Sequence, residues 1–151
     1  MKEFTVKDNK KIQLTLEADE NCEGKKVITA YDDRDLHQIG FMNFKIKGDT
    51  AYIWSFRIDD EEFLRTGVGT VMLNCFEDYA CRCRAFRVDG RFYPNGAGAE
   101  FSKDFYIKHD YDIYRDGYEQ YIYKRLNPTE IKIRNEKIDY SLKPNEQPFE
   151  Q

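Results

Sequence analysis

The chain has 151 residues, a length that fits one domain with its own hydrophobic core, because domains commonly contain about 100 to 200 residues. Its 24 Lys and Arg against 28 Asp and Glu give a net charge of −4, which argues against a general nucleic-acid binder, since such proteins present a basic face. No apolar run approaches the roughly 20 residues of a membrane span, and residues 1–6 do not resemble a signal peptide, so we expect a cytoplasmic protein without a membrane partner.

The four cysteines are Cys22, Cys75, Cys81 and Cys83. In a chain without an export signal we expect them to be reduced thiols. One residue separates Cys81 from Cys83, whereas the cysteines of a zinc knuckle are two to four residues apart, and no second Cys or His pair lies near in the sequence. The sequence therefore predicts no metal site.

The first 58 residues alternate apolar and polar side chains with the period of two that is typical of strands. The expected strands are 4–6, 12–16, 26–31, 39–46 and 52–58. Gly48 and Asp49 predict the turn of a hairpin between the last two strands. The same period predicts a shared face on strand 52–58 for Tyr52, Trp54, Phe56 and Ile58.

The pattern changes at Gly67. Val68, Met72 and Phe76 recur at three- and four-residue spacing, which predicts an amphipathic helix. A strand at 85–88, a turn-rich stretch and a second helix with Phe101 and Phe105 one turn apart follow. Two further strands, 112–114 and 120–123, flank a turn at Gly117.

The last 25 residues read as an extension. Three of the 4 prolines of the chain, Pro128, Pro144 and Pro148, lie there, which places a boundary between residues 1–126 and 127–151. Alternation in 130–133 and 137–142 predicts an appended hairpin that turns near Asn135, and from Lys143 onward we expect a disordered tail.

A glycine-containing turn at residues 63–70 connects a strand to the first long helix. Gly67 and Gly69 let backbone N–H groups approach a ligand, and the helix start adds unpaired donors and a positive dipole, as a phosphate or pyrophosphate site requires. Arg65 adds a cation and Thr70 a hydroxyl. The turn lacks the Gly-Lys-Ser/Thr of a P-loop and the third glycine of a dinucleotide fingerprint. The alternative is that the glycines only permit a tight turn and close packing.

This order of elements resembles that of the GCN5-related N-acetyltransferase (GNAT) family. The acetyl-CoA loop of that family reads Gln/Arg-x-x-Gly-x-Gly/Ala, and the matching residues here are Leu64-Arg65-Thr66-Gly67-Val68-Gly69. A second signature resembles Phe-Tyr-x-Lys-x-Gly-Phe, and here it is Phe105-Tyr106-Ile107-Lys108-His109-Asp110-Tyr111. Both glycines and the Phe-Tyr-x-Lys match. Leu64 departs from the first signature, and Asp110 with Tyr111 departs from the second.

The resemblance covers residues 26–125 and implies an α+β fold, with a mixed, mostly antiparallel central sheet of about seven strands flanked by helices. The family places one or two helices between its first two strands, whereas residues 9–25 predict only strand and turn. Such reduced N-terminal helices imply a more open acceptor site, or one that is closed by the C-terminal tail or by a partner chain, as in a homodimer.

The resemblance also implies a reaction: acetyl-CoA donates an acetyl group to a primary amine, a small molecule or a peptide, by direct attack of the amine on the thioester. The cofactor-binding residues so implied are Phe56, Arg57, Ile58, Leu64, Arg65, Thr66, Gly67, Val68, Gly69 and Thr70. Tyr106 matches the tyrosine that protonates the leaving thiolate as general acid, with core packing as the alternative for this side chain. Carboxylates that are candidate bases by proximity alone are Asp59, Asp60, Glu61, Glu62 and Asp89.

Two other functions stay open. A non-catalytic CoA-binding or partner-binding domain of the same fold fits Leu64 at the Gln/Arg position, the lack of a carboxylate in 52–58 and the missing helices. Acyl transfer to an aminoacyl-tRNA is disfavoured by the acidic net charge.

Aromatic residues make up 15% of the chain and gather from the second helix into the last strands. The tyrosines concerned are Tyr106, Tyr111, Tyr114, Tyr118, Tyr121 and Tyr123. Half-buried strand packing accounts for such a cluster. The functional alternative is an aromatic wall near the acceptor, where rings receive a cationic or aromatic amine.

Overall fold

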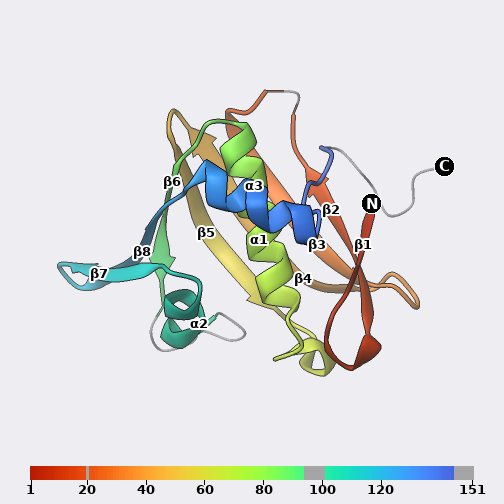
Figure 1. The fold of residues 1–151 in the computed structure, drawn as a ribbon. Coiled ribbons are helices and arrows are strands. Elements are labelled where there is room, and N and C mark those ends of the chain that lie inside the picture. The colour runs from red at the N-terminus through yellow and green to blue at the C-terminus, as the bar shows by residue number, and fades with distance from the viewer. Residues whose placement is uncertain (20, 94–100, 145–151) are drawn as a thin grey trace.

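A mostly antiparallel sheet of eight strands organises the described part of the chain, residues 1–19, 21–93 and 101–144 of the computed structural model (Figure 1). The strands are β1 (Lys2–Thr5), β2 (Lys11–Glu17), β3 (Gly24–Asp32), β4 (Gln38–Lys47), β5 (Thr50–Ile58), β6 (Arg87–Phe92), β7 (Asp112–Asp116) and β8 (Glu119–Arg125). Their order is β1–β2–β3–β4–β5–β6–β8–β7, and of these neighbours β5 and β6 are parallel. The predicted α+β class is confirmed, with eight strands where about seven were expected.

The helices are α1 (Val68–Arg82), α2 (Lys103–Lys108) and α3 (Pro128–Lys137), with short 3-10 turns η1 (Lys7–Asn9) and η2 (Glu61–Phe63). Figure 1 shows α1 and α3 on the same face of the sheet. The apolar stripe of α1 is buried there, and the Phe76 ring meets Phe44 of β4 edge to face, with centroids 4.9 Å apart. Burying a side chain of this size contributes about 1.5–3 kcal/mol, and the period of the sequence predicted this helix correctly.

The N-terminal region contains no α-helix among the residues described before α1. Strands β1 and β2 are joined by η1 alone, and β2 leads to β3 through a short loop. The expectation of reduced N-terminal helices is therefore confirmed for this part of the chain. As a result, the sheet face that points away from α1 has no helix over it among the described residues.

Strand β5 contains a β-bulge at Trp54. The ladder with β4 pairs Asn43 with Ser55 but Phe44 with Ile53, so Trp54 is the extra residue on β5. A bulge of this kind reverses the alternation of side chains between the two faces. The face predicted for this strand is therefore wrong.

After the bulge, β5 buries a different set of positions. Phe56 and Ile58 face α1 and are buried, whereas Tyr52 is half-buried on the opposite face and Trp54 is 40% exposed. Strict alternation does not distinguish a bulged strand from a regular one, because every residue in 52–58 suits a strand.

The C-terminal extension forms a helix and not the predicted hairpin. Asn127 accepts hydrogen bonds from the N–H groups of Thr129 and Glu130, and Pro128 occupies the first helical position. Asn-Pro is a strong helix start, and it outweighs the alternation of Ile131 and Ile133. Beyond α3, Tyr140 and Leu142 are buried and Pro144 forms an isolated bridge with Leu16. Residues 145–151, where most of the expected disordered tail falls, lie outside the described residues.

A buried ionic network holds α3 against α1. Glu77 of α1 is 1% exposed and accepts hydrogen bonds from the Tyr111 hydroxyl at 2.8 Å, Lys124 Nζ at 3.0 Å and Arg134 Nη1 at 3.0 Å. Arg134 also donates to the Asn74 side chain at 2.9 Å. One carboxylate therefore joins α1, β8, α3 and the residue before β7.

We expect Glu77→Gln to lower the free energy of unfolding by about 3 kcal/mol, because removing one member of a buried ion pair leaves the others uncompensated. Urea denaturation measures the loss. Glu130→Gln is the control, since Glu130 is an exposed α3 residue and such changes alter stability by about 0.5 kcal/mol or less. A loss below about 1 kcal/mol for Glu77→Gln would show that the network does not stabilise the docking of α3.

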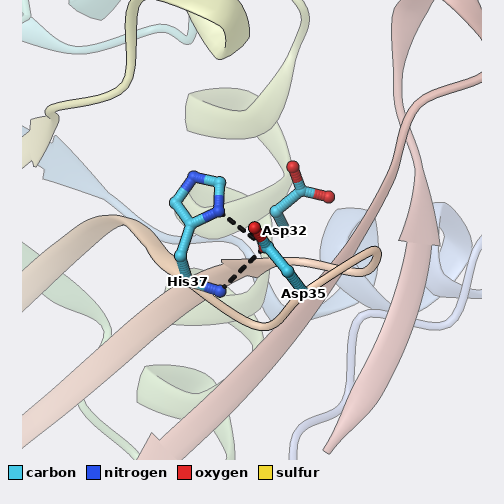
Figure 2. A group of neighbouring side chains, drawn as sticks. All are labelled: Asp32, Asp35 and His37. Carbon is cyan, nitrogen blue, oxygen red and sulfur yellow. Dashed lines mark hydrogen bonds and ion pairs between the residues drawn. The ribbon is translucent and has the colours of Figure 1, made fainter.

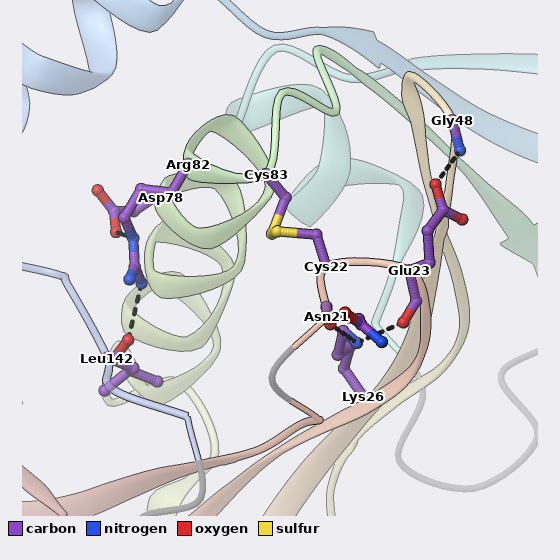
Figure 3. Close-up of a disulfide and its surroundings, with 9 residues drawn as sticks. All are labelled: Asn21, Cys22, Glu23, Lys26, Gly48, Asp78, Arg82, Cys83 and Leu142. Atoms are coloured by element: carbon purple, nitrogen blue, oxygen red, sulfur yellow. Dashed lines mark hydrogen bonds and ion pairs between the residues drawn. A yellow bond between two sulfur atoms is a disulfide. The ribbon is translucent and has the colours of Figure 1, made fainter.

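A disulfide joins Cys22 to Cys83, so the expectation of four reduced thiols is wrong for this pair (Figure 3). Cys22 lies in the β2–β3 loop, and Cys83 follows the last turn of α1. Lys26 Nζ fastens this loop by donating to the carbonyl oxygens of Asn21 and Glu23, both at 2.8 Å. The two cysteines are 61 residues apart in sequence, and only the packing of α1 on the sheet brings them together.

Cys75 is buried and Cys81 is half-buried, and both are free thiols. None of the helices in the described residues is long and apolar enough to span a membrane.

Candidate functional site

Strands β5 and β6 pair over four rungs and then separate. The parallel register runs from Thr50–Arg87 to Ile53–Gly90, although β5 continues to Ile58. A Cβ on Gly90 would lie 2.7 Å from the carbonyl oxygen of Ile53, so the last rung requires glycine. Beyond it, β5 has no strand neighbour on this side among the residues that the structure describes, which leaves backbone groups for an extended ligand. We call this separation of β5 from β6 the splay.

The turn before α1 lies beside this splay. Gly67 has φ 97°, and a Cβ on it would meet no atom within 4 Å, so its backbone conformation is what requires glycine. Thr66 is buried, its hydroxyl donates to the Phe63 carbonyl at 2.6 Å, and its own carbonyl accepts from the Lys7 N–H at 2.9 Å. Hydrogen bonds to η2 and to η1 thus hold the turn in place.

The first hydrogen bond of α1 runs from Val71 N–H to the Gly67 carbonyl at 3.1 Å. The N–H groups of Val68, Gly69 and Thr70 therefore have no partner within the helix. Together with the positive end of the helix dipole, such donors suit a phosphate group.

Three phenylalanines fill the space between the turn and β5. A Cβ on Gly69 would lie 2.4 Å from Phe101 Cζ, so the Phe101 ring rests directly on this glycine. Phe101 also packs on Phe56 of β5, with centroids 4.3 Å apart, and stacks on Phe105 at 4.1 Å. The predicted placement of Phe101 within the second helix is wrong, because the Ser102 side chain caps α2 and the helix begins at Lys103.

Thr70 is engaged by a residue that the sequence did not single out. Its hydroxyl lies 3.0 Å from His109 Nε2, at the end of α2. Burial and the neighbouring Lys108 lower the pKa of His109, which keeps the ring neutral at physiological pH. The pair closes the side of the turn next to α2. Thr70 and His109 are 39 residues apart in the sequence, so their contact could not be predicted from the sequence.

Tyr106 lies on α2 and is 4% exposed. Its ring meets Phe92, at the end of β6, and Tyr111 edge to face, with centroids 6.2 Å and 5.7 Å away. The side chain is therefore on the α1 face, near the end of the strand that departs from β5.

The remaining implied cofactor residues divide by exposure. Ile58 is buried, Arg57 is half-buried and forms an ion pair with Asp59 at 2.7 Å, and Leu64 is 45% exposed. Arg65 is exposed at φ 60°, so its side chain projects from the turn. Arg57 and Ile58 are neighbours on β5, so their side chains point to opposite faces of the sheet.

Most carboxylates that follow β5 already have partners. Asp59 pairs with Arg57, Glu62 pairs with Arg34 at 2.5 Å, and Asp60 caps η2. These contacts give them roles at the end of the strand, and they identify no base among them.

Asp32, Asp35 and His37 each bring one potential ligand atom within 4.8 Å of the others (Figure 2). His37 Nδ1 lies 2.6 Å from Asp35, and Nε2 lies 2.7 Å from Asp60, and these carboxylates, Asp60 first, raise the pKa of His37. The Arg34 guanidinium binds both oxygens of Asp32. Because these groups satisfy one another, we interpret the cluster as an ion-pair network that joins the β3–β4 turn to the end of β5.

The fold is that of the GNAT-family acetyltransferases. The PaiA N-acetyltransferase from Thermoplasma acidophilum, solved in complex with coenzyme A, matches with a TM-score of 0.55 and 18% identity over 66% of this chain and 59% of its own. An acetyltransferase from Bacillus cereus matches with a TM-score of 0.55 and 20% identity over 72% and 79% of the two chains. A cAMP-binding acyltransferase from Mycobacterium smegmatis matches with a TM-score of 0.65 and 10% identity over 92% and 52%.

The match spans less than two thirds of the first and third of these proteins. No sequence model of a protein family and no curated protein sequence matches the chain. At these identities the likeness shows the fold alone.

Proposed function

We propose that the protein is an acetyl-CoA-dependent N-acetyltransferase that acts on a primary amine. The observation that carries the proposal is the splay of β5 from β6 directly beside the glycine turn and the N-terminus of α1. An acyl-CoA needs both features, since its diphosphate requires N–H donors and its pantetheine arm is an extended chain with amide groups.

The N–H groups of Val68, Gly69 and Thr70 receive the diphosphate, and the arm runs along β5 beyond Trp54. The Phe101 ring covers Gly69, so it moves aside when the cofactor enters. Arg65, which projects from the same turn, adds a positive charge near the diphosphate.

In the transfer step a neutral amine attacks the thioester carbonyl. A backbone N–H of β5 stabilises the oxyanion, the C–S bond breaks, and Tyr106 gives its proton to the departing thiolate. The amine loses a proton to solvent as the C–N bond forms, and the Tyr106 phenolate takes a proton back from solvent.

Tyr106→Phe is expected to lower kcat by about 100-fold, since a positioned general acid contributes about 10² to 10⁴ in rate, while the Kd for acetyl-CoA stays within about twofold. Steady-state kinetics and calorimetry measure the two quantities. Tyr118→Phe, at a fully exposed tyrosine, serves as the control and leaves both unchanged. An undiminished kcat in Tyr106→Phe would leave this residue as a packing residue only.

A non-catalytic CoA-binding domain is the second candidate. The presence of Leu64 at the family's Gln/Arg position favours it. Release of free thiol from acetyl-CoA across a panel of amines distinguishes the two. Release that depends on an amine supports the transferase, whereas acetyl-CoA binding without release by any amine supports the second candidate.

A further inference from the structure

The sheet face opposite α1 carries a row of tyrosines around one carboxylate. The strand register places Tyr52 of β5 beside Asp89 of β6, and Asp89 opposite Tyr123 of β8. Directly paired residues point to the same face of a sheet, and none of the helices in the described part of the chain covers this face (Figure 1). Asp89 therefore lies between two tyrosines on one face of the sheet, and not at a strand end.

Asp89 has neutral partners. The Tyr114 hydroxyl donates to its two oxygens at 3.1 Å and 3.3 Å, and the Gly90 N–H donates to Oδ1 at 2.9 Å. Burial and this carboxylate raise the pKa of Tyr114 to about 12, so Tyr114 stays a neutral donor. No Lys, Arg or His in the described residues forms an ion pair with Asp89, whereas Glu77 has two cationic partners.

Cationic side chains that share this face are directed to other groups, and Arg87, two residues before Asp89 on β6, lies 3.8 Å from Asp49. Arg91 forms an ion pair with Glu119 at 3.2 Å. Lys45, which follows Tyr52 in the row across the sheet, has its Nζ 5.7 Å from the centroid of the Tyr52 ring. That contact shows an ammonium group accommodated over a ring of this surface.

This surface adjoins the splay. Asp89 precedes Gly90, which forms the last rung with Ile53, and Trp54 follows Ile53 on the same face as Tyr52, 40% exposed. The bulge thus places a large ring at the opening, one residue from the point where β5 and β6 separate. A ligand group that contacts both Asp89 and Trp54 therefore lies at the point where β5 and β6 separate.

We infer that Tyr52, Trp54, Asp89 and Tyr114 bind the ammonium group of an organic amine with an apolar stem. Asp89 supplies the negative charge and a hydrogen-bond acceptor, and the rings supply cation–π and apolar contact. The identification of this amine as the acetyl acceptor rests on the proposed function, whereas the binding site itself does not. A site of this kind binds a cationic amine in preference to a neutral or an acidic molecule.

Trp54 makes a direct test available. It is the single tryptophan of the chain, so the tryptophan fluorescence of the protein responds to ligands that bind at this surface. Benzylamine, which is protonated at neutral pH, and benzyl alcohol, its uncharged counterpart, are titrated at constant ionic strength with the tryptophan excited selectively. We expect a saturable change in emission with benzylamine and at least about tenfold weaker binding of the alcohol. Equal binding of the two probes overturns the inference.

Asp89→Asn keeps an acceptor for Tyr114 and removes the charge, so we expect it to weaken benzylamine binding by at least about tenfold. Asp112→Asn is the matched control. Asp112 is exposed and pairs with Tyr123 on the same face, but it lies on β7, and β8 separates it from Asp89 on β6. Equal weakening in both variants, or none in Asp89→Asn, contradicts the assigned role. An unchanged urea midpoint shows that both variants are folded.

The titration requires no acetyl-CoA, which separates the two failures. Benzylamine binding without acetyl-CoA binding overturns the proposed function and leaves the amine site. Acetyl-CoA binding without benzylamine binding overturns the amine site and leaves the proposed function.

Discussion

Gly67→Glu is expected to weaken acetyl-CoA binding by at least about 100-fold. A side chain at this position points into open space beside the unpaired N–H groups of α1, where a carboxylate faces the diphosphate. Juxtaposed like charges cost several kcal/mol, and each 1.4 kcal/mol is tenfold in affinity. Calorimetric titration of acetyl-CoA measures the change.

The control is Gly117→Glu. Gly117 has φ 65° and the same open surroundings, but it lies in the β7–β8 turn, far from the turn that precedes α1 (Figure 1). Both variants carry the strain of a left-handed non-glycine residue, about 1–2 kcal/mol, so their stabilities fall together. If both retain wild-type affinity, the glycine turn does not hold the cofactor.

Reduction of the Cys22–Cys83 disulfide is expected to lower the free energy of unfolding by about 4 kcal/mol. The bond closes a loop of 61 residues, and in the chain-entropy description a loop of this length restricts the unfolded state by about that amount. Urea denaturation with and without a reductant measures the loss, which makes the stability of the fold dependent on its redox environment.

Two variants test the assignment. Cys22→Ser has the stability of the reduced protein and no longer responds to the reductant, whereas Cys81→Ser, at the half-buried free thiol, keeps the full response. A wild-type protein that is equally stable under both conditions would mean that the bond does not form in solution.

Helix α1 and the glycine turn were predictable because their signals are local. The spacing of Val68, Met72 and Phe76 defines a buried stripe regardless of its partner, and the positive φ of Gly67 is a property of one residue. The fold class followed from the order of such signals along the chain.

Other features depend on distant residues. The bulge at Trp54 exists only relative to the register of β4, and the disulfide depends on where the β2–β3 loop meets the end of α1. The C-terminal helix is a different case, since Asn127 and Pro128 are a local start signal and the alternation of the isoleucines obscured it.

The candidate site was predictable in part for the same reason. The turn was visible in the sequence, but the ring of Phe101 on Gly69 and the pairing of His109 with Thr70 bring α2 against α1 across about 30 to 40 residues. Asp89 appeared as one carboxylate among five candidates. Its setting between Tyr52 and Tyr123 arises from two neighbouring strands, so only the assembled sheet distinguishes it from the others.

Amide hydrogen exchange with and without acetyl-CoA tests the central claim most directly. The N–H groups of Val68, Gly69 and Thr70 have no partner within α1, so no helical hydrogen bond protects them from exchange in the free protein. We predict that acetyl-CoA slows exchange in this turn and in β5 beyond Trp54, and leaves the Gly117 turn unchanged. Acetyl-CoA binding that protects neither segment would contradict the account.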